Sequence, residues 1–233
     1  MINWVVARSV ALSAVLESAA RLQEIVPDAI LVGGAAAALY AGHRDSFDHD
    51  HVLYDLKDRF DAVLEALEAT DGWVTNRVAP FKLILGELGD IEAGVRQLIR
   101  TRPVEITSVT LDSGHVVRVP TLAETLRIKA YLIVARNQTR DFLDVVALAE
   151  RMPEREAVAT LARIDDYYAD QLVEGHGVAS QLVRQLSDPR PADSRTTREL
   201  HRYKNLDPRW HDWSAVVREC QSLATGMVGG DAG

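Results

Sequence analysis

Apolar and polar residues follow one another along this chain in patterns that predict both helices and strands. Residues 9–25 and residues 59–69 place apolar side chains at helical spacing. Two short runs, 107–111 and 115–119, flank a polar Asp-Ser-Gly segment, which is typical of a β-hairpin. After residue 120 the pattern turns helical. The chain is therefore predicted to be α+β, with a small mixed β-sheet flanked by helices and a helical C-terminal half.

The change of pattern near residue 120 also predicts a division of the chain. We expect residues 1–119 to form a core that carries the sheet, and residues 120–233 to form a helical region that packs on that core. A stretch rich in Pro, Asp and Ser at 187–194 predicts a loop within the helical region. The chain has 233 residues, of which 47% are hydrophobic, and this is enough for a core with a helical module.

An apolar run at residues 29–32 predicts a strand that leads directly into Gly33 and Gly34. Residues 35–40 have high helix propensity, so a helix should begin directly after the two glycines. Glycine lets the backbone approach an anion closely, and the free N–H groups at a helix N-terminus favour phosphate. The turn is therefore a candidate site for a triphosphate.

Two carboxylates follow in the segment from Asp48 to Leu53, which reads as a strand. Side chains alternate between the two faces of a strand, so Asp48 and Asp50 should point to the same face. Two carboxylates that lie close together repel each other unless a positive charge lies between them, and a hard divalent cation supplies it. This pattern predicts a magnesium site.

A helix is predicted from residue 121, and Lys129 falls on its apolar stripe. A lysine that points toward the protein body should pair with a carboxylate or a phosphate, because an unpaired buried ammonium is costly. The alternative is that the alkyl stem packs on the stripe while the ammonium reaches water. Thr139 is a candidate N-cap for the next helix, and Asp141 and Asp144 lie in its first turn, where the helix dipole stabilises acids whatever their function.

These segments together resemble the DNA polymerase β-like nucleotidyltransferase superfamily. The superfamily pattern is a hydrophobic residue followed by Gly-Gly or Gly-Ser, then an Asp-x-Asp or Asp-x-Glu pair on a strand. The run with Arg44 and Ser46 before the pair is similar to the AbiEii/AbiGii type, which comprises nucleotidyltransferase toxins of bacterial toxin–antitoxin and abortive-infection systems. The segment 120–144, with its Lys, Arg and Arg-Asp-hydrophobic-x-Asp pattern, resembles a further block of that family.

The resemblance covers about residues 29–150 and implies roles for individual residues. Gly33 and Gly34 would hold the phosphates of a nucleoside triphosphate, with help from Ser46. Asp48 and Asp50 would bind Mg²⁺ or Mn²⁺. Lys129 would contact the triphosphate, and Asp141 would place Lys129 or act as a base, whereas Asp144 would order the helix junction. The implied reaction moves a nucleotidyl group to an acceptor hydroxyl, with an RNA end such as tRNA as acceptor and an antitoxin as restraining partner.

Superfamily members often carry a third carboxylate on a neighbouring strand. The candidates here are Glu105, on a strand-like segment, and Glu87, which follows the possible strand 81–85. If neither reaches the metal, two carboxylates and the phosphates of the substrate would suffice, as magnesium sites allow.

The histidines beside the two acids depart from the family pattern, in which those positions are apolar. His49 and His51 raise the possibility of a modified site. Read from residue types alone, His43, His49, His51 and the two acids could form a transition-metal cluster. Strand alternation argues against this cluster, because it places the histidines and the carboxylates on opposite faces.

Charge and composition limit the other possibilities. The net charge of −8 argues against strong nonspecific binding of nucleic acid. It favours, as an alternative acceptor, a cationic small molecule of the aminoglycoside kind; a protein acceptor or a degenerate nucleotide-binding regulator are the remaining alternatives. No apolar run is long enough to span a bilayer, and residues 1–8 do not read as a signal peptide. The single cysteine, Cys220, suits a reducing cytoplasm and reads as a buried structural thiol.

Overall fold

The computed structural model describes residues 9–171 and 175–229. Internal contacts divide the chain into unit 1, formed by Met1–Leu39 and Asp45–Thr121, and unit 2, formed by Tyr40–Arg44 and Leu122–Gly233. The expectation that a helical region packs on the core stays a prediction. Residues 1–8, which carry the expectation about a signal peptide, lie outside the described part.

Unit 1 contains a mixed sheet, which confirms the predicted α+β class. Its strands are β1 (Ile30–Val32), β2 (Asp48–Leu53), β3 (Trp73–Ala79), β4 (Leu83–Leu88) and β5 (Ile91–Gln97). The strand order is β1-β2-β5-β4-β3, and β2 pairs with β5 in parallel, whereas the other neighbours are antiparallel.

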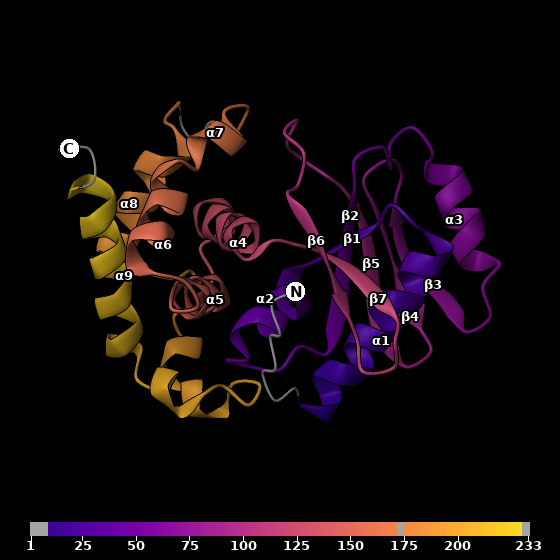
Figure 1. Ribbon diagram of the computed structural model, residues 1–233, viewed down its shortest axis with the longest axis horizontal. Helices are drawn as coiled ribbons and strands as arrows, with labels where there is room; N and C mark the ends of the chain where they lie inside the picture. Colours follow the sequence, from indigo (N-terminus) through magenta and orange to yellow (C-terminus); the bar gives the residue numbers. More distant parts are fainter. Residues whose placement is uncertain (1–8, 172–174, 230–233) are drawn as a thin grey trace. The chain divides into compact units, whose positions relative to one another are not determined.

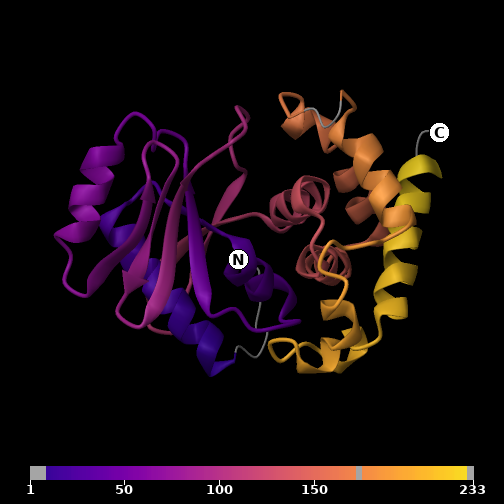
Figure 2. The ribbon, with the colours of Figure 1, turned by 180° about the vertical axis from the view of Figure 1, so that it is seen from behind.

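Two helices cover one face of this sheet (Figures 1 and 2). They are α1 (Val10–Ile25) and α3 (Phe60–Glu68), and both match the expected amphipathic segments. Their apolar side chains share a core with the inward residues of the strands, including Leu53, Ile84 and Val95. The face of the sheet that carries Asp48 and Asp50 is the opposite one, because side chains alternate along β2.

The predicted hairpin is present as β6 (Ile106–Thr110) and β7 (Val116–Pro120). Gln23 of α1 contacts the hairpin: its side-chain amide donates to the carbonyl of Arg118 on β7 and accepts from the backbone N–H of Arg118. The proposed strand at 81–85 is partly wrong. Phe81 has a φ of 64° and lies in the turn before β4, which begins at Leu83.

Unit 2 is helical in its described part. Its helices are α4 (Leu122–Arg136), α5 (Thr139–Ala149), α6 (Glu154–Ala162), α7 (Asp165–Tyr168), α8 (Val178–Ser187) and α9 (Trp213–Gly229), with short 3-10 turns η1 (Thr196–Arg198), η2 (Leu200–Arg202) and η3 (Pro208–Trp210). Helix α4 packs against α5, α6 and α8, and α9 packs against α5, α6 and α8 (Figure 1). Cys220 of α9 is buried, and burial raises the pKa of its thiol, as expected of a structural cysteine.

The predicted loop at 187–194 has a structural role. Thr139 was expected to cap α5, but it lies inside the helix, and its N–H and hydroxyl both donate to the carboxylate of Asp193.

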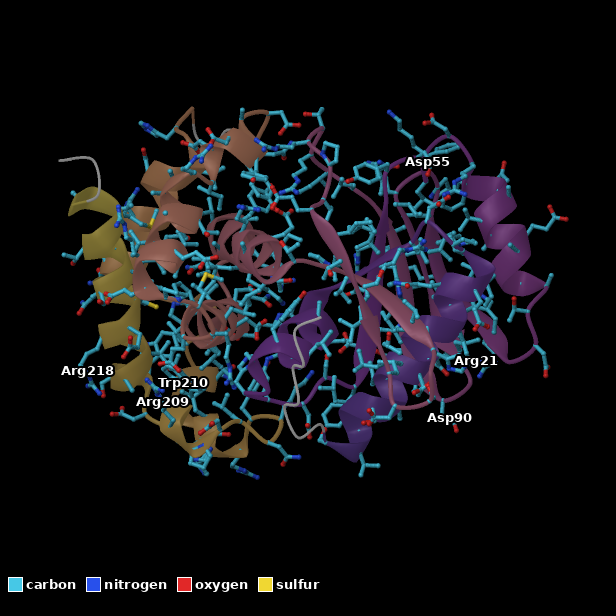
Figure 3. The ribbon with its side chains drawn as sticks, in the orientation of Figure 1. Arg21, Asp55, Asp90, Arg209, Trp210 and Arg218 are labelled. Atoms are coloured by element: carbon cyan, nitrogen blue, oxygen red, sulfur yellow. The ribbon has the colours of Figure 1, made fainter. Side chains whose placement is uncertain are left out.

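Farther along, Trp210 of η3 is buried, and the Arg209 guanidinium lies 4.9 Å from the centre of its ring (Figure 3).

The inward face of β2 carries His49 and His51, both buried against the α1 side of the sheet. The Nε2 of His49 lies 3.0 Å from the hydroxyl of Ser18 on α1, and the two imidazole rings meet edge to face at 5.2 Å. Burial lowers the pKa of His49 to about 4 and lowers the pKa of His51 well below its usual range. Both rings are therefore neutral core groups at neutral pH.

The transition-metal alternative is wrong for the part of the chain that the structure describes. Within it, no group of three or more His, Cys, Asp or Glu side chains is placed to hold a metal ion. The two faces of β2 are separate, as the alternation in its burial shows, with His49 and His51 inside.

The neutral state of His49 makes stability depend on pH. Its folded pKa lies below the unfolded value of 6.5, so the unfolded chain binds a proton first as the pH falls. The contribution of the neutral His49 ring to stability is present above pH 6.5 and is lost as the pH falls toward 4. We expect His49 alone to lower the free energy of unfolding by about 2 kcal/mol between pH 7 and pH 5, as measured by urea denaturation. In His49→Gln this loss should shrink by about that amount, and an unchanged loss would contradict the assignment.

Candidate functional site

The two candidate metal ligands lie on the same face of β2. Asp48 and Asp50 are both half-buried, whereas the residues between and after them are buried in the core. Ser46 is fully buried, and its hydroxyl donates to the Asp48 carboxylate at 3.2 Å. This contact makes Ser46 orient a candidate metal ligand, and the expected contact of Ser46 with phosphate stays a prediction.

The glycine turn lies directly beside the second acid. Val32, at the end of β1, pairs with Asp50 across the antiparallel ladder, and α2 (Gly33–Ala41) begins at Gly33 itself, rather than after the two glycines. Gly33 has a φ of 77°, which L side chains rarely adopt, and a Cβ at this position would lie 3.5 Å from the Asp50 carboxylate. The N-terminus of α2 therefore presents its backbone next to Asp50, where a phosphate and a cation could meet.

Strand β5 supplies the other wall of the site. The parallel register places Glu92 opposite Asp48 and Gly94 opposite Asp50. A cavity of about 290 Å³ opens at this face, and its lining includes Asp48, Asp50, Asn76, Arg77, Glu92 and Arg96.

Glu92 is the acid that sequence reasoning missed. It lines the cavity with the two aspartates, whereas Glu105 precedes β6 and is exposed, and Glu87 accepts a hydrogen bond from Asn76. The signal for Glu92 was an acid between Ile91 and Ala93, which is typical of a strand with one polar face. In the described part of the chain the three acids do not form a ready three-ligand metal site. The donor set is two carboxylates, which fits magnesium that keeps waters or substrate phosphates as further ligands.

Lys129 and Asp144 belong to a buried ionic cluster in unit 2. The Asp144 carboxylate accepts from Arg44 through Nε at 2.8 Å and Nη2 at 3.0 Å, lies 2.7 Å from Nε2 of His43, and pairs with the Lys129 ammonium at 2.7 Å. Burial would raise the pKa of Asp144, but the cations of Arg44 and Lys129 lower it well below its usual range. Burial lowers the pKa of His43.

This cluster shows which aspartate of α5 places Lys129. Lys129 does point inward and finds a carboxylate, but its partner is Asp144 rather than Asp141. Asp141 is instead held by Arg136, through two hydrogen bonds of 2.7 Å each. Asp144 also binds His43 and Arg44, which lie five and four residues before Asp48 along the chain. The cluster therefore anchors the segment that leads into β2.

Comparison with solved structures finds the same arrangement of elements. MenT4, a nucleotidyltransferase toxin from Mycobacterium tuberculosis, superposes with a TM-score of 0.60 at 16% identity, covering 93% of this chain and 82% of that one. JHP933 from Helicobacter pylori superposes with a TM-score of 0.50, also at 16% identity, covering 96% and 94%. No protein-family model matches the chain.

Sequence comparison finds a different kind of relative. The heme uptake protein MmpL11 of Mycobacterium tuberculosis is 32% identical in an alignment of 242 positions, gaps included, that covers 92% of this chain and 22% of that protein. The mycolic acid-containing lipids exporter MmpL11 of Mycolicibacterium smegmatis is 40% identical over 129 residues, which is 55% of this chain and 13% of that protein. The chain thus spans about a fifth or less of the length of these relatives. In its own described residues, no helix has the length and apolar character needed to cross a membrane.

The structural comparison and the observed mixed sheet with its flanking helices indicate the same fold. The chain has the fold of the nucleotidyltransferases, with β2 and β5 carrying the candidate site.

The buried cluster predicts unequal effects of two similar substitutions in α5. Asp144→Asn leaves Arg44 and Lys129, which are 3% and 2% exposed, without their counter-charge, and should lower the free energy of unfolding by about 3–5 kcal/mol. Asp141→Asn is the matched control and should cost clearly less, because Arg136 is 34% exposed and can turn to water. Urea denaturation of both variants measures the difference, and equal losses would contradict the central role of Asp144.

Proposed function

We propose that the chain is a metal-dependent nucleotidyltransferase that moves the nucleotidyl group of a nucleoside triphosphate to an acceptor hydroxyl, with release of pyrophosphate. One observation carries the proposal. Asp48 and Asp50 share one face of β2, and the helix N-terminus at Gly33 lies beside Asp50. A phosphate chain at that N-terminus would be next to a cation on the two carboxylates, which is the arrangement that phosphoryl chemistry requires.

Each residue of the site has a task in this proposal. Mg²⁺ or Mn²⁺, when bound, would neutralise developing charge and align the reacting oxygens. Asp48 and Asp50 hold the cation, and Ser46 fixes the carboxylate of Asp48. The backbone N–H groups at Gly33 and Gly34 bind phosphate oxygens. Glu92 adds negative charge at the wall of the cavity and strengthens the preference for a cation.

Lys129 and Asp141 are proposed to act by positioning. Lys129 was expected to contact the triphosphate, but its side chain is 2% exposed and its ammonium pairs with Asp144. By holding Asp144, it helps to fix His43 and Arg44 and thus the segment before Asp48. Asp141 holds Arg136 and the start of α5. A base role for Asp141 would require its release from Arg136.

For the acceptor we propose an RNA end such as that of tRNA, in a protein that acts as a toxin and is restrained by an antitoxin. The support is the resemblance of the segments at 29–53 and 120–144 to the AbiEii/AbiGii type, together with a fold shared with MenT4, which is a nucleotidyltransferase toxin.

A cationic small molecule of the aminoglycoside kind is the second candidate acceptor. The observation that favours it is charge, because the chain carries −8 and the cavity contains Asp48, Asp50 and Glu92. The histidines that suggested a degenerate regulator lie in the core and do not line the cavity. The activities named for the MmpL11 relatives belong to much longer proteins and are not proposed for this chain.

The proposal predicts that transfer depends on Asp48. Purified protein with Mg²⁺, each of the four α-labelled nucleoside triphosphates and total RNA should label a tRNA-sized band. Asp48→Asn removes a metal ligand but keeps the size of the side chain, so transfer should fall by about 1,000-fold or more while the fold persists. Asp90→Asn, in the exposed turn between β4 and β5, is the matched control and should retain transfer.

Three outcomes separate the possibilities. Labelled RNA that is lost only in Asp48→Asn supports the enzyme and its RNA acceptor. Label on an aminoglycoside, with none on RNA, favours the second acceptor. Transfer that persists in Asp48→Asn overturns the assignment of the site.

A further inference from the structure

Asp50 has a basic partner on the neighbouring strand. The Nε of Arg96 on β5 donates to Oδ1 of Asp50 at 3.1 Å, and the two side chains are 45% and 30% exposed. The parallel register explains the contact, because Gly94 lies opposite Asp50 and Arg96 follows two residues later on the same face. A candidate metal ligand is thus already paired with a guanidinium.

Gly94 makes this pairing possible. A Cβ at position 94 would lie 2.6 Å from Oδ1 of Asp50, which is closer than side-chain atoms approach one another. The missing side chain lets the Asp50 carboxylate lean over β5, and there Arg96 reaches it. Asp50 and Arg96 both line the cavity, together with Asp48, Glu92 and Arg77.

The charges of the cavity explain why such a partner is needed. Three carboxylates, those of Asp48, Asp50 and Glu92, line the cavity, and a nearby guanidinium reduces their mutual repulsion. Arg96 supplies one. Because both groups are partly exposed, the ion pair is weak and can exchange at little cost.

We propose that Arg96 is the counter-ion of Asp50 and that it exchanges its partner when a divalent cation binds. Arg96 then releases the Asp50 carboxylate and binds a phosphate group of the substrate. The inference rests on the proposed nucleotidyltransferase function. A divalent cation brings twice the charge of a guanidinium to the carboxylate, and the released guanidinium has the planar donors that match phosphate. Arg96 thus links metal binding to substrate binding within one cavity.

Mn²⁺ titration of the full chain, by calorimetry or electron paramagnetic resonance, tests the first half. Arg96→Gln should bind Mn²⁺ about two- to fivefold more tightly than the wild type, because the competing ion pair is gone. Arg77→Gln removes a charge from the same cavity but no ion pair with a carboxylate of the described residues, so its gain should be smaller. Arg59→Gln breaks exposed ion pairs with Asp28 and Asp55 elsewhere in unit 1 and should leave Mn²⁺ binding unchanged. A gain in Arg96→Gln no larger than that in Arg77→Gln would overturn the exchange.

Steady-state kinetics at saturating Mn²⁺ test the second half. Arg96→Gln should raise KM about tenfold for the substrate whose phosphate it binds, and Arg96→Lys should recover part of the loss. Varying the triphosphate and the RNA separately identifies the source of that phosphate. An unchanged KM for both would overturn the phosphate role. A purely structural role for Arg96 would weaken Mn²⁺ and substrate together, whereas the proposal predicts shifts in opposite directions.

The same variants distinguish a failure of the Arg96 exchange from a failure of the proposed nucleotidyltransferase function. If the wild type binds Mn²⁺ and Asp48→Asn does not, the metal site stands whatever Arg96→Gln shows, and an unaltered Arg96→Gln overturns the exchange alone. If no form binds Mn²⁺, both proposals fail.

Discussion

The register of β2 is the constraint on which the site depends. With a side-chain period of two, β2 points Asp48 and Asp50 to one face and His49, His51 and Leu53 to the core. A shift by one residue would bury the two acids and expose the core residues, so burial of the core face fixes the register. Pairing with β1 on one side and β5 on the other then places the Gly33 turn, Gly94 and Arg96 around Asp50. One alternating strand therefore determines both the core and the candidate chemistry.

A second constraint acts on the segment before β2. Asp144 is fully buried and holds His43, Arg44 and Lys129 within unit 2. Buried charges are tolerated when they are paired and hydrogen-bonded, and removing one partner leaves the others in a costly state. The cluster thus stabilises one conformation of the residues that lead into Ser46 and Asp48. We interpret Lys129 and Asp144 as fixing this segment, rather than as direct contacts to a nucleotide.

Much of this could be predicted from local pattern. The helices at 10–25 and 60–68, the hairpin, the glycine turn and the acid pair all follow from periodicity and turn chemistry. What the sequence could not supply is pairing between distant segments. Glu92 and Arg96 become part of the site only because β5 pairs in parallel with β2, and the choice of Asp144 over Asp141 depends on which helix face meets Lys129. Phe81 was misassigned because its positive φ places it in a turn that an apolar run conceals.

The most direct test of the account is a crystal structure of the protein with Mn²⁺ and a non-hydrolysable nucleoside triphosphate, with data collected at the manganese absorption edge. The account predicts an anomalous peak between the carboxylates of Asp48 and Asp50, and triphosphate oxygens on the N–H groups at Gly33 and Gly34. Manganese bound elsewhere, or a triphosphate away from the start of α2, would contradict it.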